Sequence, residues 1–297
     1  MKFWLFITTF LFLIIGCKPA KEQKENRKLE GEYQEGGTLV ADTVINTILQ
    51  QIPSPLEMSA LIKQTGSRYD KNILNIPSSY SRYINSYEQA LNLGVFGTDL
   101  GYSNLYEENQ QCILYIGAIK ELADELRIDQ FFNFKLIQRL ADERNLDSLL
   151  LISTQSYNQV NGFFQEQQRP GLSILLLVGG WMEAMNISCQ VGSMTAVKKP
   201  IYEKIGEQKI VLESIIKLMQ YFKDSDENFT RLNRELTELG AIYESVKINR
   251  TYATPTYTEK NGVVETKDNS TSTVDLDDHT FILIKTKVQE IRSEIVS

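Results

Sequence analysis

The stretch that most constrains the fold is LSILLLVGGWMEAM, from Leu172 to Met185, the most apolar run after the N-terminus. A run this apolar has to be covered on every side, so the rest of the fold must be built around it. The first seven residues alone would also suit a buried strand, because periodicity does not separate the two in a short apolar run. Helix-compatible residues follow and the neighbouring segments are helical, so we predict a central buried helix over 172–190. Gly179 and Gly180 each cost such a helix about 1 kcal/mol relative to Ala, which indicates close backbone packing or a kink.

Amphipathic helices are predicted on both sides of this element. Apolar residues recur at helical spacing, and Gly, Pro, Asp or Asn mark the ends. The helices are expected from Thr38 to before Pro53, then over 54–66, 81–93, a segment capped by Thr98 or Asp99, 109–126, 133–143, 146–168, 201–222 and 228–246. The pattern predicts an all-α protein, either a multi-helix bundle or stacked helical hairpins.

A change of composition follows residue 246. Residues 248–274 are rich in Thr, Tyr and Val, and Asn261-Gly262 separates two alternating stretches, which is a hairpin signal. Asp277-Asp278 can then cap a C-terminal helix over 281–295. We therefore expect a helical domain over 38–246 and, over 247–297, a small β-hairpin-like segment and a helix that pack on the same domain.

The N-terminus has the form of an export signal. Lys2 precedes an apolar block from Phe3 to Ile15, and the block is too short to cross about 30 Å of hydrocarbon, which takes about 20 residues. The block ends on Ile-Ile-Gly-Cys, and this sequence resembles the lipobox of bacterial lipoproteins. The resemblance implies that residues 1–16 are a signal peptide and that Cys17 becomes the lipidated N-terminus. The alternative interpretations are a plain cleaved signal or a tail-less anchor.

A polar tether should follow the anchor. Residues 17–37 carry almost no apolar side chains and cannot bury enough surface to offset chain entropy. Among lipoproteins of the common sorting type, an Asp after the lipidated Cys marks retention in the inner membrane. Lys18 stands there instead, so the resemblance implies a cell-envelope protein anchored in the outer rather than the inner membrane, and leaves open whether it faces the periplasm or the outside.

Composition excludes several classes of function. The formal net charge is −7 and there is no stripe of Arg and Lys, so the chain is a poor nucleic-acid binder. His279 is the only histidine, so a paired-histidine zinc site is excluded. It follows Asp277-Asp278 and is expected at a solvated helix start. After Cys17, only Cys112 and Cys189 remain; both have apolar neighbours, and pairing between them stays open.

Four stretches together carry a family resemblance. They are IPSPLEMSALIK (52–63), ALNLGVFGTDLGY (90–102), GGWMEAM (179–185) and IGEQKIVL (205–212). The set resembles a group of uncharacterised Bacteroidota lipoproteins over about Ile52 to Val246. The resemblance implies an α-helical exported domain and supplies no activity.

Glu183 is the most unusual residue of the chain, because it places a carboxylate in the most apolar helix. Such a group must find a cation or donors, or stay protonated. One interpretation is a pocket acid beside Trp181, with Asp99 and Tyr102 from the glycine-flanked GTDLGY stretch. The other is a structural pair with Lys204, Lys209 or an Arg, with Asp99 acting only as a helix cap.

These observations favour a lipid-anchored, non-enzymatic binding or scaffold protein. The alternatives are a ligand-capturing lipoprotein with a pocket near Trp181 and Glu183 and, further off, a hydrolase that uses carboxylates alone. No cofactor or metal is expected. The membrane, through the lipid on Cys17, and an envelope protein or a small molecule are the expected partners.

Overall fold

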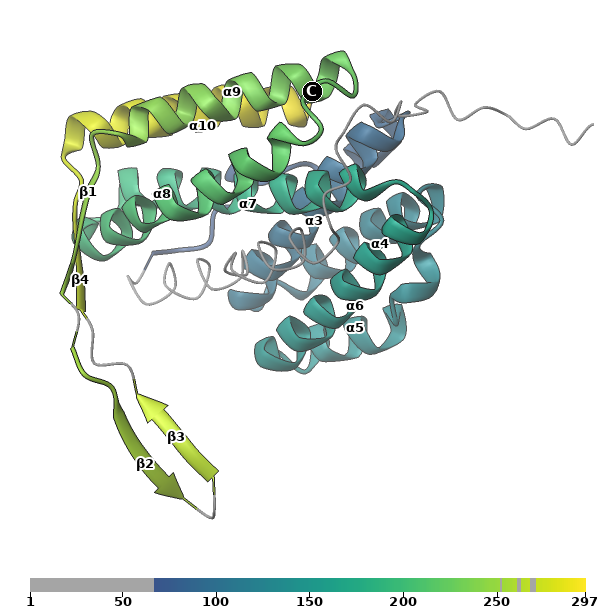
Figure 1. The fold of residues 1–297 in the computed structure, drawn as a ribbon. Coiled ribbons are helices and arrows are strands. Elements are labelled where there is room, and N and C mark those ends of the chain that lie inside the picture. The colour runs from purple at the N-terminus through teal and green to yellow at the C-terminus, as the bar shows by residue number, and fades with distance from the viewer. Residues whose placement is uncertain (1–66, 252, 261–262, 268–270) are drawn as a thin grey trace, which may run out of the picture. The chain divides into compact units, whose positions relative to one another are not determined.

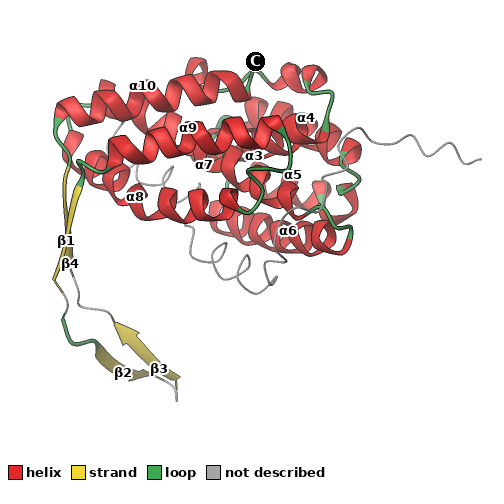
Figure 2. Ribbon diagram, turned by 45° about the horizontal axis from the view of Figure 1, so that its top comes forward, coloured by secondary structure: helices red, strands yellow, loops and turns green. Residues whose placement is uncertain are grey.

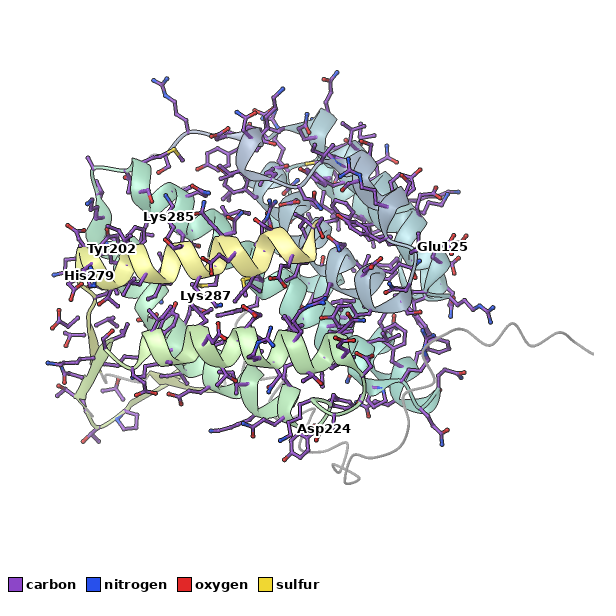
Figure 3. The ribbon with its side chains drawn as sticks, turned by 90° about the horizontal axis from the view of Figure 1, so that it is seen from above. Glu125, Tyr202, Asp224, His279, Lys285 and Lys287 are labelled. Atoms are coloured by element: carbon purple, nitrogen blue, oxygen red, sulfur yellow. The ribbon has the colours of Figure 1, made fainter. Side chains whose placement is uncertain are left out.

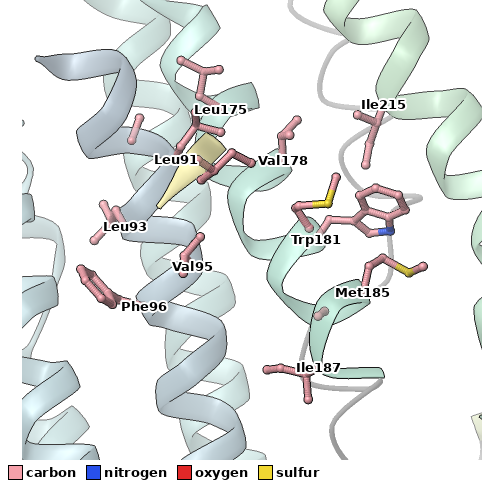
Figure 4. Packing of buried hydrophobic residues seen from close by; sticks show 14 of the residues in the cluster. Leu91, Leu93, Val95, Phe96, Leu175, Val178, Trp181, Met185, Ile187 and Ile215 are labelled. Carbon is pink, nitrogen blue, oxygen red and sulfur yellow. The ribbon is translucent and has the colours of Figure 1, made fainter. Parts of the chain in front are cut away.

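Two long helices, α3 (Ser86–Leu105) and α7 (Pro170–Met194), lie side by side at the centre of the fold (Figure 1). A computed structural model describes residues 67–251, 253–260, 263–267 and 271–297. α7 carries the apolar run, and most of its residues are buried. The prediction of a central buried helix is therefore confirmed. Figure 4 shows the core between these helices: side chains of α3 and α7 interleave, and Trp181 points away from α3 toward Ile215 of α8.

Glycines bring the backbones of α3 and α7 into contact. A Cβ atom on Gly179 would overlap the carbonyl oxygen of Leu91, and one on Gly94 would overlap the carbonyl oxygen of Leu176. Thr98 extends its hydroxyl across the same contact and donates to the carbonyl of Gly180 at 3.0 Å. Close backbone packing, one of the two predicted roles of the glycine pair in α7, is thus what the structure contains.

The remaining helices form two groups around the pair of α3 and α7. On one side, α4 (Asn109–Glu125), α5 (Phe134–Asp142) and α6 (Leu146–Glu166) connect α3 to α7 through successive contacts. On the other, α8 (Lys198–Gln220), α9 (Glu227–Tyr243) and α10 (Asp278–Ile295) follow each other, and α10 returns to pack on α7 (Figure 2). In the described residues, three short 3₁₀ turns accompany these helices: η1 (Lys71–Ile73), η2 (Pro77–Arg82) and η3 (Asp129–Phe131).

Side-chain caps fix several of these helix starts as the sequence predicts. Asp226 accepts a hydrogen bond from the amide of Phe229, and Asp277 accepts one from the amide of Thr280. Asn133 caps α5 through the amide of Leu136. Each cap satisfies one of the amide groups that a helix start leaves without a partner. The all-α fold class is confirmed.

Two antiparallel strand pairs lie between α9 and α10. β2 (Thr256–Lys260) pairs with β3 (Val263–Lys267), so the hairpin predicted around Asn261-Gly262 is confirmed. β1 (Lys247–Thr251) pairs with β4 (Thr271–Asp275) and forms a second ribbon that the sequence did not resolve. The β1–β4 ribbon contacts α8, where the side chain of Val274 occupies the space beside Gly206.

One local prediction is wrong. Helix α3 does not end at Gly94 but runs on to Leu105, so Asp99 lies inside it and is not a cap. Helix α6 begins at Leu146, as predicted, and its N-cap is Asn145, whose side chain accepts from the amide of Ser148. Ile210 fits the apolar spacing of α8 and is nevertheless exposed. The predicted signal peptide, Cys17, the tether and the first two predicted helices lie outside the described residues.

Within the described part of the chain, α7 is the one helix long and apolar enough to cross a membrane. Of its most apolar window, 89% is buried inside the protein. This is the behaviour of a core helix, as its contacts with α3, α6, α8 and α10 indicate.

Candidate functional site

The polar centre of the fold is a pair of buried carboxyl groups, Glu183 of α7 and Asp99 of α3. Both residues are 0% exposed. They face each other because α3 and α7 cross in close contact at Gly94 and Gly179, one to two turns earlier in each helix. The glycine contact thus places two acids from separate stretches of sequence in the same part of the core.

Glu183 is paired with Arg292 of α10. The guanidinium of Arg292 donates from Nε to Oε2 of Glu183 at 2.8 Å and from Nη2 to Oε1 at 3.0 Å. The Arg292 side chain is 18% exposed, so the pair is shielded from water along most of its length. A bidentate pair fixes geometry as well as charge, and here it joins the C-terminal half of α10 to the central helix. Of the partners that the sequence suggested for Glu183, an Arg is the one found, and neither Lys204 nor Lys209 is bonded to it.

Asp99 sits in an environment that favours its protonated form. Burial raises the pKa of the Asp99 carboxyl well above its usual range, and the nearby Glu183 carboxylate raises it further, against the opposing effect of Arg292. Its Oδ2 accepts a hydrogen bond from the backbone amide of Asn75 at 3.1 Å. Its Oδ1 has no donor. A protonated Asp99 can donate a hydrogen bond to the neighbouring Glu183, so one guanidinium and one proton neutralise the two acids.

Asn75, in the link between η1 and η2, connects this acid pair to the surrounding elements. Besides its bond to Asp99, its side chain donates to the hydroxyl of Tyr83 at 3.0 Å. Its carbonyl accepts from the hydroxyl of Tyr115 in α4 at 2.8 Å. The side chain of Asn92 then donates to the carbonyl of Ile295 at 2.8 Å, at the end of α10. The network therefore gathers α3, α4, α7, α10 and the 67–85 segment around one buried polar centre.

The structure separates Trp181 and Tyr102 from this centre. Trp181 lies on another side of α7, where its indole donates to Gln208 of α8 at 2.9 Å. Tyr102 is buried one turn beyond Asp99, with its ring stacked on Tyr69 at 5.4 Å and tilted against Tyr106. Of the four residues in the predicted pocket, Asp99 and Glu183 are thus brought together, and Trp181 and Tyr102 each belong to a different contact.

The centre is closed rather than open to a ligand. Its acids are fully buried, and the side chains of Asn75, Asn92, Tyr83 and Tyr115 are nearly so. No group of three or more potential metal-ligating side chains occurs in the residues that the structure describes. This arrangement can hold a proton and an ion pair and can fix the mutual positions of five elements. It offers no exposed nucleophile and no open cleft between carboxylates, which a glycosidase-like reaction would need.

The two thiols are kept apart. Cys112 in α4 and Cys189 in α7 are free and buried, which answers the question that the sequence left open. Burial raises the pKa of the Cys112 thiol to about 11 and that of the Cys189 thiol to about 12. Both are therefore protonated and unreactive at neutral pH.

Sequence reasoning missed Arg292 and Asn75 as members of the centre. Arg292 follows the buried Ile291 in the C-terminal helix. This position, next to the buried face of the helix, was the only feature of the sequence that could have marked Arg292 as the partner of Glu183. Asn75 stands in an irregular segment without periodicity, so nothing in the sequence marked it. Comparison of the chain with protein-family models, with curated proteins and with solved structures gave no match.

Proposed function

We propose that this protein is a lipid-anchored, non-enzymatic binding or scaffold protein of the cell envelope. The anchor is Cys17, and the helical domain presents its outer surface to partners. The proposal combines the lipobox-like N-terminus with the character of the domain's polar centre.

The closed acid pair is the observation that carries the non-enzymatic part of the proposal. Glu183 and Asp99 are 0% exposed, and Glu183 is already matched by two hydrogen bonds from Arg292. A pocket acid would need a path to the ligand and free hydrogen-bonding capacity. These acids instead hold α3, α7 and α10 together, so binding is left to the surface.

The anchor is tested by acylation and fractionation. Replacement of Cys17 by Ser removes the expected acyl acceptor, and α7, the one apolar span in the described residues, is a core helix. We expect the unaltered protein to incorporate a palmitate analogue and to pellet with membranes after a salt wash. The Cys17→Ser variant should do neither. A variant that still incorporates the analogue would contradict the proposal.

The binding role is tested by in-cell cross-linking of the lipidated protein, followed by identification of cross-linked peptides. We expect cross-links to map to surface residues of the helical domain. Glu183→Gln serves as the comparison, because it keeps the shape of the buried centre. If this variant folds normally and loses a bound small molecule that the unaltered protein carries, the ligand-capturing alternative replaces the scaffold.

A further inference from the structure

Exposed apolar side chains gather at the end of the fold where α7 ends and α10 begins. Met194 at the end of α7, Val197 before α8 and Ile282 in α10 are 61%, 52% and 57% exposed. Isolated exposed apolar residues are ordinary on a protein surface, but a contiguous group marks a contact site. We call these three residues the end patch.

The pairing of α10 with its neighbours shows that the end patch is contiguous. α10 runs antiparallel to α7: Arg292 bonds to Glu183, and Lys285 bonds to Ser193 at 2.9 Å. Asp278, further toward the start of α10, bonds to Lys198 at 3.2 Å. Ile282 lies between positions 278 and 285 on the same helix face. It therefore stands opposite the 194–197 segment.

Lysines surround the end patch. Lys198 and Lys285 form the two bonds that join α10 to the segment 193–198. Lys199 is almost fully exposed, and its Nζ lies 3.9 Å from Oε1 of Glu203. Figure 3 shows Tyr202, His279 and Lys285 around the first half of α10. Glu203, Asp277 and Asp278 balance the charge of the three lysines. Long lysine side chains with an apolar stem and a polar tip, around apolar residues, suit the boundary between water and lipid. The balance means that apolar contact rather than charge would provide the attraction.

The first described residue, Ser67, lies at this same end. α3 and α7 run in the same direction, as the contacts of Leu91 with Gly179 and of Thr98 with Gly180 show. The ends of both helices therefore lie on one side. Ser67 is bonded there, through its carbonyl, to the hydroxyl of Tyr106 just beyond α3. Ser67, the first described residue, thus lies on the side that bears the end patch.

We propose that the end patch rests on the lipid bilayer, so that the anchored domain has one membrane-facing end. This inference builds on the proposed acyl anchor at Cys17, which brings a bilayer to the domain. The apolar side chains enter the headgroup boundary, and the lysine tips stay in water.

The test uses the full acylated protein in vesicles of phosphatidylethanolamine and phosphatidylglycerol. Ile282→Cys is labelled with a polarity-sensitive fluorophore. Leu151→Cys on α6, where Leu151 is 59% exposed, is the matched control. Cys112 and Cys189 are buried and do not compete for the label. We expect a blue shift and quenching by spin-labelled lipids at position 282 and neither at position 151. Equal behaviour at the two positions overturns the proposal.

A second pair of variants separates this inference from the anchor. Val197→Asp with Ile282→Asp should reduce the quenching of a label at position 194 about tenfold, whereas Leu151→Asp should not change it. Mass spectrometry of the same sample reports acylation of Cys17. A missing acyl chain refutes the anchor alone, whereas an acylated protein without quenching refutes the end patch alone. A blue shift without lipid, together with a dimer in sedimentation, would make the end patch a contact between two copies and overturn the proposal.

Discussion

Arg292 and Glu183 are 109 residues apart in sequence, and their side chains form two hydrogen bonds of 2.8 and 3.0 Å inside the protein. The pair closes the fold, because it ties the last helix to the most buried one. A buried ion pair adds little net stability over apolar residues of the same shape, but loss of one partner leaves a buried charge without compensation. The stability lost on removing Glu183 therefore comes mainly from the buried charge of Arg292 that is left without a partner.

Replacement of Glu183 by Ala should lower the free energy of unfolding by about 3–5 kcal/mol, because Arg292 is left in the core without its partner. Glu183→Gln should cost less, since the amide oxygen can still accept one of the two hydrogen bonds. Urea denaturation followed by circular dichroism measures both values.

A double variant supplies the control for this pair. Glu183→Leu with Arg292→Met replaces both charges by apolar groups and should recover most of the stability lost in Glu183→Ala. Additive losses in the double variant would show that the two side chains are not coupled, in conflict with the observed contact.

Asp99 should make stability depend on pH. A carboxyl whose pKa is raised in the folded state keeps its proton where the unfolded chain has lost it. Its contribution is complete below the ordinary pKa of Asp, about 3.9, and declines as the pH rises toward the raised value. Asn at position 99 can donate to Glu183 and accept from the amide of Asn75 without titrating. We expect Asp99→Asn to match the unaltered protein at pH 4 and to be the more stable of the two at pH 8.

The comparison is made with denaturation curves at several pH values. Asp277→Asn is a suitable control, since Asp277 is an exposed cap whose pKa is lowered by the backbone amide of Thr280. Its contribution is present above the ordinary pKa and disappears as the pH falls through the lowered value, which is the opposite trend. A constant difference between Asp99→Asn and the unaltered protein across the pH range would show that Asp99 does not carry the buried proton.

Much of the fold could be predicted because local signals agree with the tertiary structure. Asp226 and Asp277 mark the starts of α9 and α10, and the apolar run gives α7 its central place. The prediction failed where a long-range contact reverses a local signal. Gly94 has the form of a helix end, but the close approach of α7 uses the missing side chain and the helix continues. Ile210 fits the apolar spacing of its helix and nevertheless faces outward.

The polar centre was only half predictable for the same reason. Glu183 stands out because a charge in an apolar helix needs a partner wherever that partner comes from. The identity of the partner depends on how α10 packs back on α7, which no local pattern specifies. Asp99 was assigned to a cap because its neighbours are glycines, whereas its depth in the core follows from the continuation of α3.

The two thiols offer a test of the core that needs no variant. Cys112 and Cys189 are buried and their pKa values are raised by burial, so these two thiols should not react with Ellman's reagent at pH 8 in the native protein. Both thiols should react once guanidinium chloride unfolds the chain. With Cys17 acylated as proposed, the unfolded chain should give two reactive thiols. A disulfide between Cys112 and Cys189, detected as a linked peptide, would contradict the structure.

Replacement of glycine by alanine should have opposite effects on stability at Gly179, in the contact between α3 and α7, and at Gly117, outside that contact. Gly179→Ala places a methyl group on the carbonyl of Leu91, and the backbones can separate only by disturbing the packing around Asp99 and Glu183. We expect a loss of about 1–3 kcal/mol or more, which exceeds the gain in helix propensity. Gly117 in α4 is exposed, and a Cβ atom there meets nothing within 4 Å, so Gly117→Ala should raise stability by up to about 1 kcal/mol. Thermal melts of the two variants test this prediction. A stabilised Gly179→Ala variant would mean that α3 and α7 do not approach as closely as their glycines allow.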